Sequence, residues 1–182
     1  MLYRLNTKRL INNGIRVNKN NITTISGRIT AALNSKGSCM VVFTGGPGCG
    51  KSTLARIIKQ KGFLNIPKKQ MVVIDDLRDH DNKKYNRKDL FFLIDTLKDK
   101  VLLLFDYKAA LYLKKADICI LIVINEEERL SNLKKRSAWG YKRYKKRFYR
   151  TPPIPFTYKK SDIYVCSGSI LDIFGFENEI MY

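Results

Sequence analysis

Short apolar runs recur along this chain and alternate with segments in which apolar residues are spaced three or four apart. An apolar run of four to seven residues bounded by polar ones is typical of a buried strand in a parallel sheet. Such runs predict strands at 39–43, 71–74, 101–105, 118–124 and 162–166. The helical spacing predicts helices at 53–58, 89–98, 107–115 and 126–136, and a short one from Ile170.

Strands that alternate with helices in this way favour an α/β fold. We expect a three-layer sandwich in which helices cover both faces of a five-stranded parallel sheet. Residues 1–37 form a basic N-terminal extension, for which the sequence leaves open whether helix or strand is added to the sheet edge. Residues 38–182 form one domain, with a basic lid tract at 129–161.

One segment between a predicted strand and a predicted helix is rich in glycine. Residues 45–52 match the pattern G-x-x-x-x-G-K-[ST] of a phosphate-binding loop. In this pattern backbone N–H groups converge on phosphate oxygens, the lysine reaches the β and γ phosphates, and the hydroxyl binds Mg²⁺. We therefore expect a fold of the P-loop NTPase type that binds ATP and Mg²⁺. The residues expected to hold the nucleotide are Gly45, Gly46, Pro47, Gly48, Cys49, Gly50, Lys51, Ser52 and Thr53.

The positive charge of the chain is concentrated in two segments. The net charge is +19, and seven Lys or Arg with no acid occur in residues 1–38. Twelve more, again with no acid, occur in residues 129–161, so the rest of the chain is neutral. Segments of this kind attract phosphates, whether on a nucleotide, a nucleic acid or an acidic membrane surface.

The length and composition restrict the class of protein further. A chain of 182 residues that is 45% apolar suits a single domain with a hydrophobic core. The sequence contains neither a membrane-spanning run nor a signal peptide, so we expect a soluble, intracellular (cytoplasmic) protein. Its four cysteines include no C-x-x-C pair, and we expect reduced thiols.

Several motifs resemble those of P-loop kinases of the nucleotide kinase group, most closely dephospho-CoA kinase. Residues 44–55 are similar to the family's T-G-G-x-G-x-G-K-S-T-x-A. Residues 73–76 are similar to the first four positions of its V-I-D-A-D, but Leu77 stands where the family has the last Asp. Residues 128–136 resemble its E-R-L-x-x-R lid helix, and 161–169 its closing strand near the adenine. The resemblance covers residues 38–175 and implies a kinase core, but the acceptor stays open because the family's substrate-binding insertion is absent between Asp76 and Val101.

A second resemblance concerns four residues. Residues 75–78 read Asp-Asp-Leu-Arg, which is similar to the D-D-x-R segment of phage-type polynucleotide 5′-kinases. That resemblance implies that Asp75 activates a 5′-hydroxyl and that Arg78 contacts the phosphate of the acceptor.

Phosphoryl transfer depends mainly on positioning and charge neutralisation, so few groups are needed. Asp75, at the end of a predicted strand that we expect to lie beside the phosphate loop, is the candidate general base or the residue that orients a metal-bound water. Asp106 is a candidate to hold Mg²⁺ through water with Ser52. Arg129 and Arg136 lie seven residues apart and so on one helix face, which makes them lid candidates with Lys51 as the loop cation. His80, in a polar turn, is interpreted as a surface residue.

The tract at residues 134–150 interleaves aromatic residues with cations. This composition suits single-stranded nucleic acid, whose phosphates bind cations and whose bases stack on aromatic rings. It equally suits a kinase lid whose aromatics pack on the core and whose cations grip ATP. The sequence leaves both interpretations open.

The function predicted from the sequence is that of a Mg²⁺- and ATP-dependent kinase acting on a nucleoside, nucleotide or nucleotide-like acceptor. A polynucleotide 5′-kinase is the alternative among enzymes. A nucleic-acid-binding P-loop ATPase without an acceptor is the alternative of another class, disfavoured because such ATPases usually have more chain between Lys51 and the acidic strand.

Overall fold

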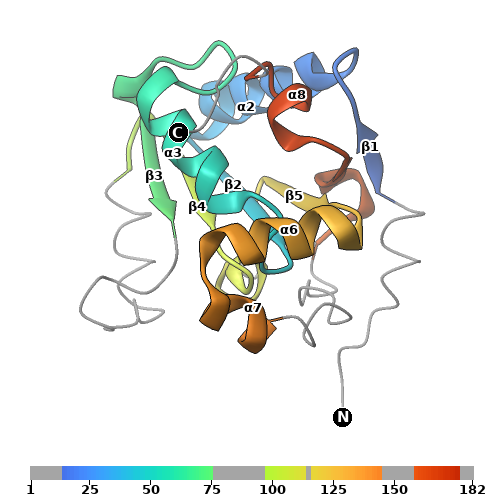
Figure 1. The fold of residues 1–182 in the computed structure, drawn as a ribbon. Helices are drawn as coiled ribbons and strands as arrows, with labels where there is room; N and C mark the ends of the chain where they lie inside the picture. Colours follow the sequence, from blue (N-terminus) through green and yellow to red (C-terminus); the bar gives the residue numbers. More distant parts are fainter. Residues whose placement is uncertain (1–13, 76–96, 114–115, 145–157, 177–182) are drawn as a thin grey trace.

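A computed structural model describes residues 14–75, 97–113, 116–144 and 158–176. Its centre is a single sheet of parallel strands in the order β1-β6-β5-β2-β4-β3 (Figure 1). The strands are β1 (Ile15–Val17), β2 (Ser38–Gly45), β3 (Met71–Asp75), β4 (Lys100–Phe105), β5 (Ile118–Val123) and β6 (Ile163–Ser167). The predicted α/β class and parallel sheet are confirmed.

The prediction of five strands is wrong, because β1 adds a sixth. Ile15 pairs with Tyr164 and Val17 with Cys166, so the sequence Ile-Arg-Val forms the edge of the sheet beside β6. Three residues are too few to show alternation or an apolar run in the sequence. Only the backbone hydrogen bonds offered by β6 make this segment a strand.

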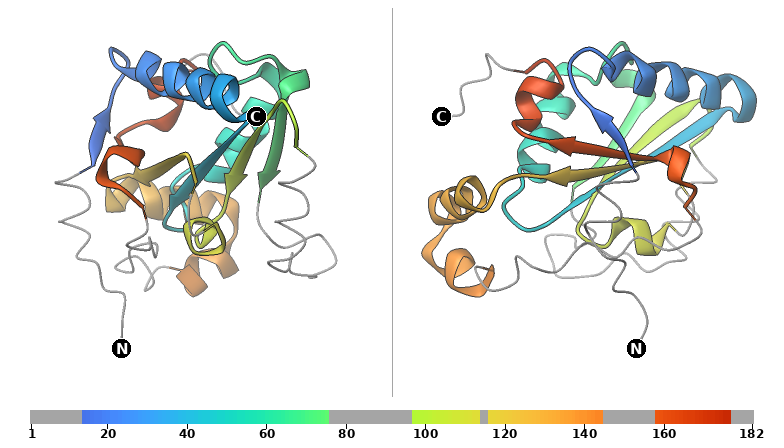
Figure 2. Two further views of the ribbon diagram at one scale, coloured as in Figure 1. Left: turned by 180° about the vertical axis from the view of Figure 1, so that it is seen from behind. Right: turned by 90° about the vertical axis from the view of Figure 1, so that its right-hand side faces the viewer.

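Helices cover both faces of the sheet (Figure 2). They are α2 (Ile22–Lys36), α3 (Lys51–Lys61), α5 (Ala109–Tyr112), α6 (Glu126–Arg136), α7 (Ala138–Tyr144) and α8 (Ile170–Ile173), with 3₁₀ turns η1 (Lys68–Gln70) and η3 (Lys160–Asp162). The predicted helix at 126–136 is confirmed. The predicted helix at 107–115 is reduced to α5, and the one at 89–98 lies almost entirely outside the described residues, with Lys98 in a turn.

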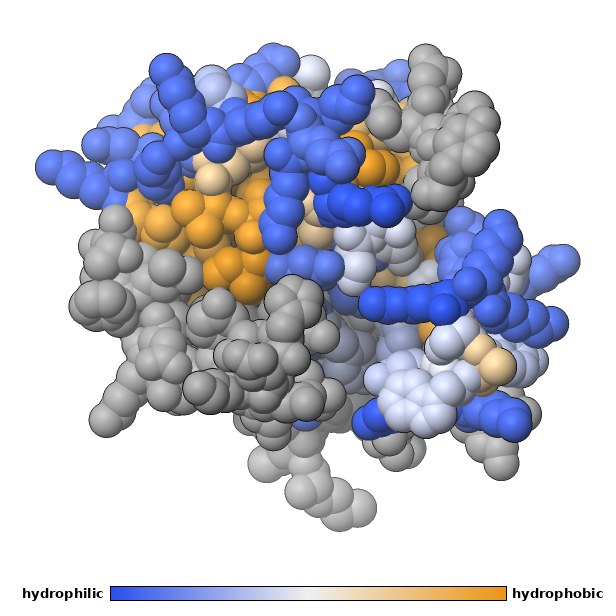
Figure 3. All heavy atoms as spheres, turned by 60° about the vertical axis from the view of Figure 1, so that its left-hand side comes forward, coloured by the Kyte–Doolittle hydropathy of each residue, from blue (hydrophilic) through white to orange (hydrophobic). Residues whose placement is uncertain are grey.

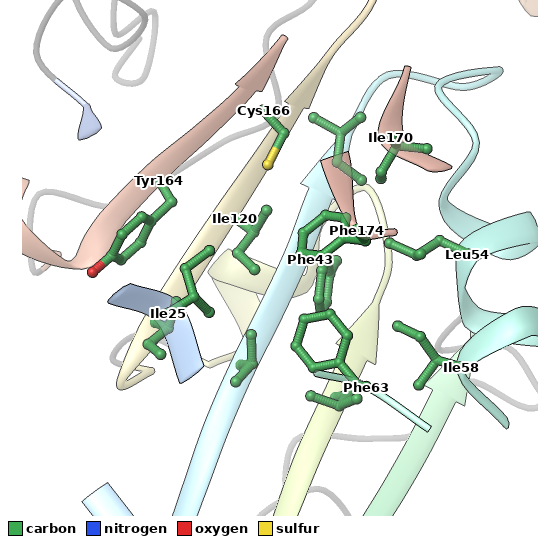
Figure 4. Close-up of a cluster of buried hydrophobic side chains, with 14 of the residues drawn as sticks. Ile25, Phe43, Leu54, Ile58, Phe63, Ile120, Tyr164, Cys166, Ile170 and Phe174 are labelled. Carbon is green, nitrogen blue, oxygen red and sulfur yellow. The ribbon is translucent and has the colours of Figure 1, made fainter. Parts of the chain in front are cut away.

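The larger of two hydrophobic clusters lies between the sheet and the helices α2, α3 and α8. Phe43 of β2 stacks on Phe105 of β4 with ring centroids 4.2 Å apart, and its edge meets Phe63 at 5.6 Å. Phe174, after α8, packs 5.3 Å from Phe63 and closes the cluster (Figure 4). Because β2, β4 and β5 are covered on both faces, their side chains form almost continuously buried runs.

The opposite face carries a smaller core. Ala109, Ala110 and Leu113 of the α5 region pack against Val42 and Leu104 of the sheet. Tyr158 covers the same face and donates its hydroxyl to the carbonyl of Leu113. Burial raises the pKa of the Tyr158 phenol, so this group stays protonated at neutral pH.

Residues 15–36, within the segment predicted as an N-terminal extension, contribute to the same sheet and core. Ile25 and Ile29 of α2 are fully buried in the main cluster. Arg28, on the same helix, forms an ion pair with Asp162 at 2.5 Å and lies over the ring of Tyr164. Helix α2 is therefore joined to the sheet near β6 by both apolar packing and a charge pair.

The four cysteines are buried, and none forms a disulfide. Burial raises the pKa of the Cys119 and Cys166 thiols, and mainly burial that of Cys39, to about 12 in each case. These three thiols are therefore neutral and unreactive at physiological pH. No helix within the described ranges is long and apolar enough to cross a membrane.

Candidate functional site

The glycine-rich loop follows β2, the strand between β5 and β4. After β2 the chain builds β3 and β4 on one side of it, and then β5 and β6 on the other side. The carboxyl end of β2 is thus the point where the strand order reverses, which is where ligands bind in open parallel sheets. The loop predicted to bind phosphate lies at this point (Figure 1).

The loop turns sharply between β2 and α3. Gly48 and Gly50 have φ angles of +89° and +88°, and the amide of Cys49 donates to the carbonyl of Gly46 at 3.3 Å. Helix α3 begins directly afterwards at Lys51, so its N-terminal amides follow the turn. Successive amides at a turn and at the start of a helix form a concave surface that suits an anion.

The side chain of Lys51 lies over this loop. Its ammonium donates to the carbonyls of Gly45 at 2.7 Å and Gly46 at 3.1 Å, and lies 3.4 Å from the sulfur of Cys49. Lys51 is half-buried, and Ser52 and Thr53 in the first helical turn are half-buried as well. The structure therefore places the loop cation and the predicted Mg²⁺-binding hydroxyl on one turn of chain.

Asp106 lies at the carboxyl end of β4, the neighbour of β2. Its amide donates to the carbonyl of Phe43 at 3.2 Å, and its carboxylate accepts the amide of Lys108 at 2.5 Å. The buried hydroxyl of Thr44 donates to the carbonyl of Tyr107 at 3.0 Å. These bonds attach the Asp106 turn to the strand that carries the loop.

Asp75 is the last residue of β3 and is half-buried. We expected its strand to lie beside the phosphate loop, and this is wrong: β4 lies between β3 and β2. Asp75 is level with Phe105 of β4, at the same end of the sheet as the loop. Arg78, the candidate for the acceptor phosphate, and His80 lie outside the described residues.

Arg129 is the most unexpected site residue. It is only 1% exposed, and its guanidinium donates to the carbonyl of Pro47 at 3.4 Å and to that of Tyr144 at 3.3 Å. Arg129 therefore connects three segments, namely the loop, α6 and α7. Arg136 is exposed at the end of the same helix, so the two arginines predicted as a lid pair have different surroundings.

Asn132 is a site residue that the sequence analysis did not identify. Its side-chain amide donates to the carbonyl of Gly48 at 3.1 Å. A Cβ at Gly48 would lie 2.9 Å from the carbonyl oxygen of Arg129 and 3.0 Å from a carbon of Leu133. Helix α6 thus packs directly against the loop backbone. The sequence could have identified Asn132, because it follows the lid candidate Arg129 by three residues and so lies on the same helix face.

Comparison of the chain with family models, curated proteins and solved structures gave no match. Within the described ranges, no group of three or more His, Cys, Asp or Glu side chains is arranged to hold a metal ion. The candidate site consists of a turn predicted to bind an anion, with one lysine and one hydroxyl, two carboxylates at strand ends, and a helix that packs against the turn.

Proposed function

We propose that this protein is a Mg²⁺- and ATP-dependent kinase that phosphorylates a nucleoside, nucleotide or nucleotide-like acceptor. The observation that supports the proposal most strongly is the position of the loop. A complete G-x-x-x-x-G-K-[ST] pattern follows the strand at which the sheet order reverses, and directly precedes a helix.

The proposed binding of ATP uses the loop and the first turn of α3. Backbone amides of residues 45–53, except Pro47, which has no N–H, bind the phosphate oxygens. Lys51 exchanges its bonds to the Gly45 and Gly46 carbonyls for bonds to the β and γ phosphates. Ser52 and Asp106 provide hard oxygen ligands of the kind that Mg²⁺ prefers, Asp106 through water. Mg²⁺ held there neutralises charge on the transferred group.

In the proposed reaction the acceptor hydroxyl attacks the γ-phosphorus, and the bond to the β–γ bridging oxygen breaks, which releases ADP. Asp75 accepts the proton of the hydroxyl. Arg78 binds the phosphate of the acceptor, and Arg136 supplies positive charge from the end of α6. Arg129 acts differently from our expectation, as a positioning residue that holds the loop through Pro47.

The ATPase alternative receives less support. Residues 51–75 are all described, and they contain only α3, an isolated bridge between Phe63 and Ile66, η1 and β3. The short connection has no additional strand between the loop helix and the acidic strand. A polynucleotide 5′-kinase remains an alternative because residues 75–78 carry the resemblance.

The test is transfer of labelled γ-phosphate from ATP with Mg²⁺ to a panel of nucleosides, nucleoside monophosphates, dephospho-CoA and 5′-hydroxyl oligonucleotides. We expect label on one acceptor, with transfer by Lys51→Ala reduced on the order of a hundredfold or more and its fold retained, because charge neutralisation is the main catalytic effect. The exposed Lys59 on the same helix provides the matched control, Lys59→Ala. Release of free phosphate without a labelled acceptor would refute the kinase, and undiminished transfer by Lys51→Ala would refute the site.

A further inference from the structure

The outer surface formed by α6 and α7 carries a dense group of cations. We define the α6–α7 surface by six exposed residues, namely Lys134, Lys135, Arg136, Trp139, Lys142 and Arg143. No acid occurs in residues 129–161, and within the part of the chain that the structure describes no ion pair joins these five cations to a carboxylate. The surface is therefore strongly positive.

Aromatic rings are interleaved with these cations. Trp139 is 63% exposed, which is exceptional for a large hydrophobic residue among those described. The guanidinium carbon of Arg143 lies 4.7 Å from the centroid of the Trp139 ring and 5.5 Å from that of Tyr144. The Lys134 ammonium lies 5.3 Å from the Tyr141 ring. Figure 3 shows, at the lower right, long hydrophilic side chains standing around less polar ones.

The two helices hold this arrangement in place. They are separated only by Ser137, whose amide donates to the carbonyl of Leu133 and whose hydroxyl oxygen accepts the amide of Gly140. Leu133 and Gly140 are buried between the helices and the rest of the molecule. The guanidinium of Arg129 bonds the carbonyl of Tyr144, at the other end of α7. Because these contacts fix the backbone of the two helices, only the exposed side chains lose conformational entropy on binding.

We propose that the α6–α7 surface binds single-stranded nucleic acid. Its cations bind consecutive phosphates, and Trp139 stacks on a base that no partner strand covers. An acidic protein would bind the cations alike but does not need an exposed aromatic ring. An anionic membrane binds helices that present an apolar face, whereas among the described residues of this surface Trp139 is the sole large hydrophobic side chain that is exposed. A duplex supplies phosphates, but its bases are already stacked on one another.

The proposal goes beyond the kinase proposal and does not depend on ATP. The two sites are nonetheless connected, because Arg129 bonds both Pro47 of the loop and Tyr144 of α7. A strand bound on the α6–α7 surface therefore lies on a structure that also supports the phosphate loop.

The chain has one tryptophan, Trp139, so fluorescence excited selectively at tryptophan, beyond the absorption of the ten tyrosines, reports on this surface. The test is a titration of the full chain, without ATP, with single-stranded DNA and RNA oligonucleotides of about ten nucleotides, within the usual site sizes. We expect quenching of the fluorescence, and an affinity measured by anisotropy of labelled oligonucleotide that falls steeply with salt. A duplex of equal length is expected to bind more weakly and to leave the fluorescence unchanged.

Three variants sharpen the test. Trp139→Ala is expected to weaken binding on the order of tenfold through lost stacking. The double variant Lys142→Gln/Arg143→Gln is expected to lower the slope of log affinity against log salt by about 1.4, which corresponds to two phosphate contacts on a single strand. The matched control is Lys68→Gln/Lys69→Gln, two adjacent exposed lysines on η1, with affinity expected to change less than about twofold.

Binding without quenching, equal losses in the two double variants, or equal quenching by polyglutamate or by anionic vesicles would each overturn the proposal. The variant Lys51→Ala distinguishes the proposal for the α6–α7 surface from the kinase proposal. If this variant binds oligonucleotide as the unchanged protein does, the surface is supported whether or not transfer is observed. If the oligonucleotide does not bind although transfer to a small nucleotide is found, the surface proposal alone fails.

Discussion

The phosphate loop and the α6–α7 surface both present cations to proposed phosphate ligands, but they are built in opposite ways. The loop has one cation, Lys51, which bonds two carbonyls and lies against a sulfur. The loop backbone packs so closely against α6 that a Cβ added at Gly48 would clash with the helix. The surface has five exposed cations and packs only through its inner face. If both regions bind phosphate as proposed, recognition at the loop depends on single backbone positions, whereas recognition at the surface depends on charge distributed over several side chains.

The largest effect that separates the two regions is expected from Gly48→Ala. A Cβ there would lie 2.9 Å from the Arg129 carbonyl oxygen, at a backbone φ of +89° that side chains rarely adopt. We expect a loss of about 3 kcal/mol of stability from backbone strain and overpacking, measured by urea unfolding. The control is Gly46→Ala, since nothing lies within 4 Å of a Cβ at Gly46. Equal stabilities of the two variants would show that α6 does not constrain the loop.

A smaller effect is expected from Asn132→Ala, which removes the hydrogen bond from α6 to the Gly48 carbonyl. The loss of one half-buried hydrogen bond is expected to cost about 1 kcal/mol in urea unfolding. It is also expected to raise the KM for ATP more than it lowers kcat, because the loop is loosened while Lys51 is kept. Ser131→Ala, at an exposed neighbouring position, is the control. A KM unchanged from that of the control would contradict a positioning role for Asn132.

Lys36 provides an intermediate case, an exposed cation that has a carboxylate partner. Its ammonium bonds Asp117, which raises the pKa of Lys36 above its ordinary value of 10.5. The stabilisation is therefore complete below the ordinary pKa and is lost as the pH rises through the raised one. Because the side chain is 60% exposed, solvent screens the pair, and we expect Lys36→Met to cost only about 0.5 kcal/mol at neutral pH.

The measurement for this pair is urea unfolding from neutral pH to about pH 11.5, above the ordinary lysine pKa. The difference between Lys36→Met and the unchanged protein is expected to shrink toward zero at the alkaline end. Lys68→Met, at an exposed lysine on η1, is the control for charge alone. A difference that stays constant with pH would show that the side chain acts through packing.

The smallest effect on stability is expected at the α6–α7 surface. Lys142→Gln/Arg143→Gln removes two exposed cations and the contacts of Arg143 with two aromatic rings. Exposed side chains of this kind contribute little to stability, so we expect a change below about 0.5 kcal/mol, although the same variant weakens oligonucleotide binding. A larger loss in urea unfolding would mean that these cations serve the fold, and the contrast with the loop would fail.

Much of the sheet could be predicted from the sequence, because its central strands are buried on both faces and so appear as apolar runs. Helix α2 could also have been predicted, since Ile22, Ile25, Ile29 and Leu33 follow a helical spacing. The start of α5 could not, because it depends on local hydrogen bonds: the Asp106 carboxylate accepts the amide of Lys108, and the helix begins only at Ala109.

The loop was the most predictable part of the site, because its pattern is local. The surroundings of Arg129 were not predictable, since a charged residue on a polar helix is normally exposed. Its burial depends on the Pro47 and Tyr144 carbonyls, which become its neighbours only after α6 packs on the loop. The placement of β4 between Asp75 and the loop strand likewise depends on topology, which the order of strands along the chain does not specify.

The pairing of β1 with β6 has a consequence for the way this chain leaves the ribosome. The described strands β2, β3, β4 and β5 are all synthesised after Ile15 and before its partner Tyr164. Arg28 is likewise synthesised long before Asp162, its ion-pair partner. At about 5–20 residues per second, synthesis leaves β1 without its neighbour for about 7 to 30 seconds. β1 can therefore pair in the sheet only after β6 has been synthesised, so a chain arrested before β6 would carry an unpaired β1 that chaperones and proteases could recognise.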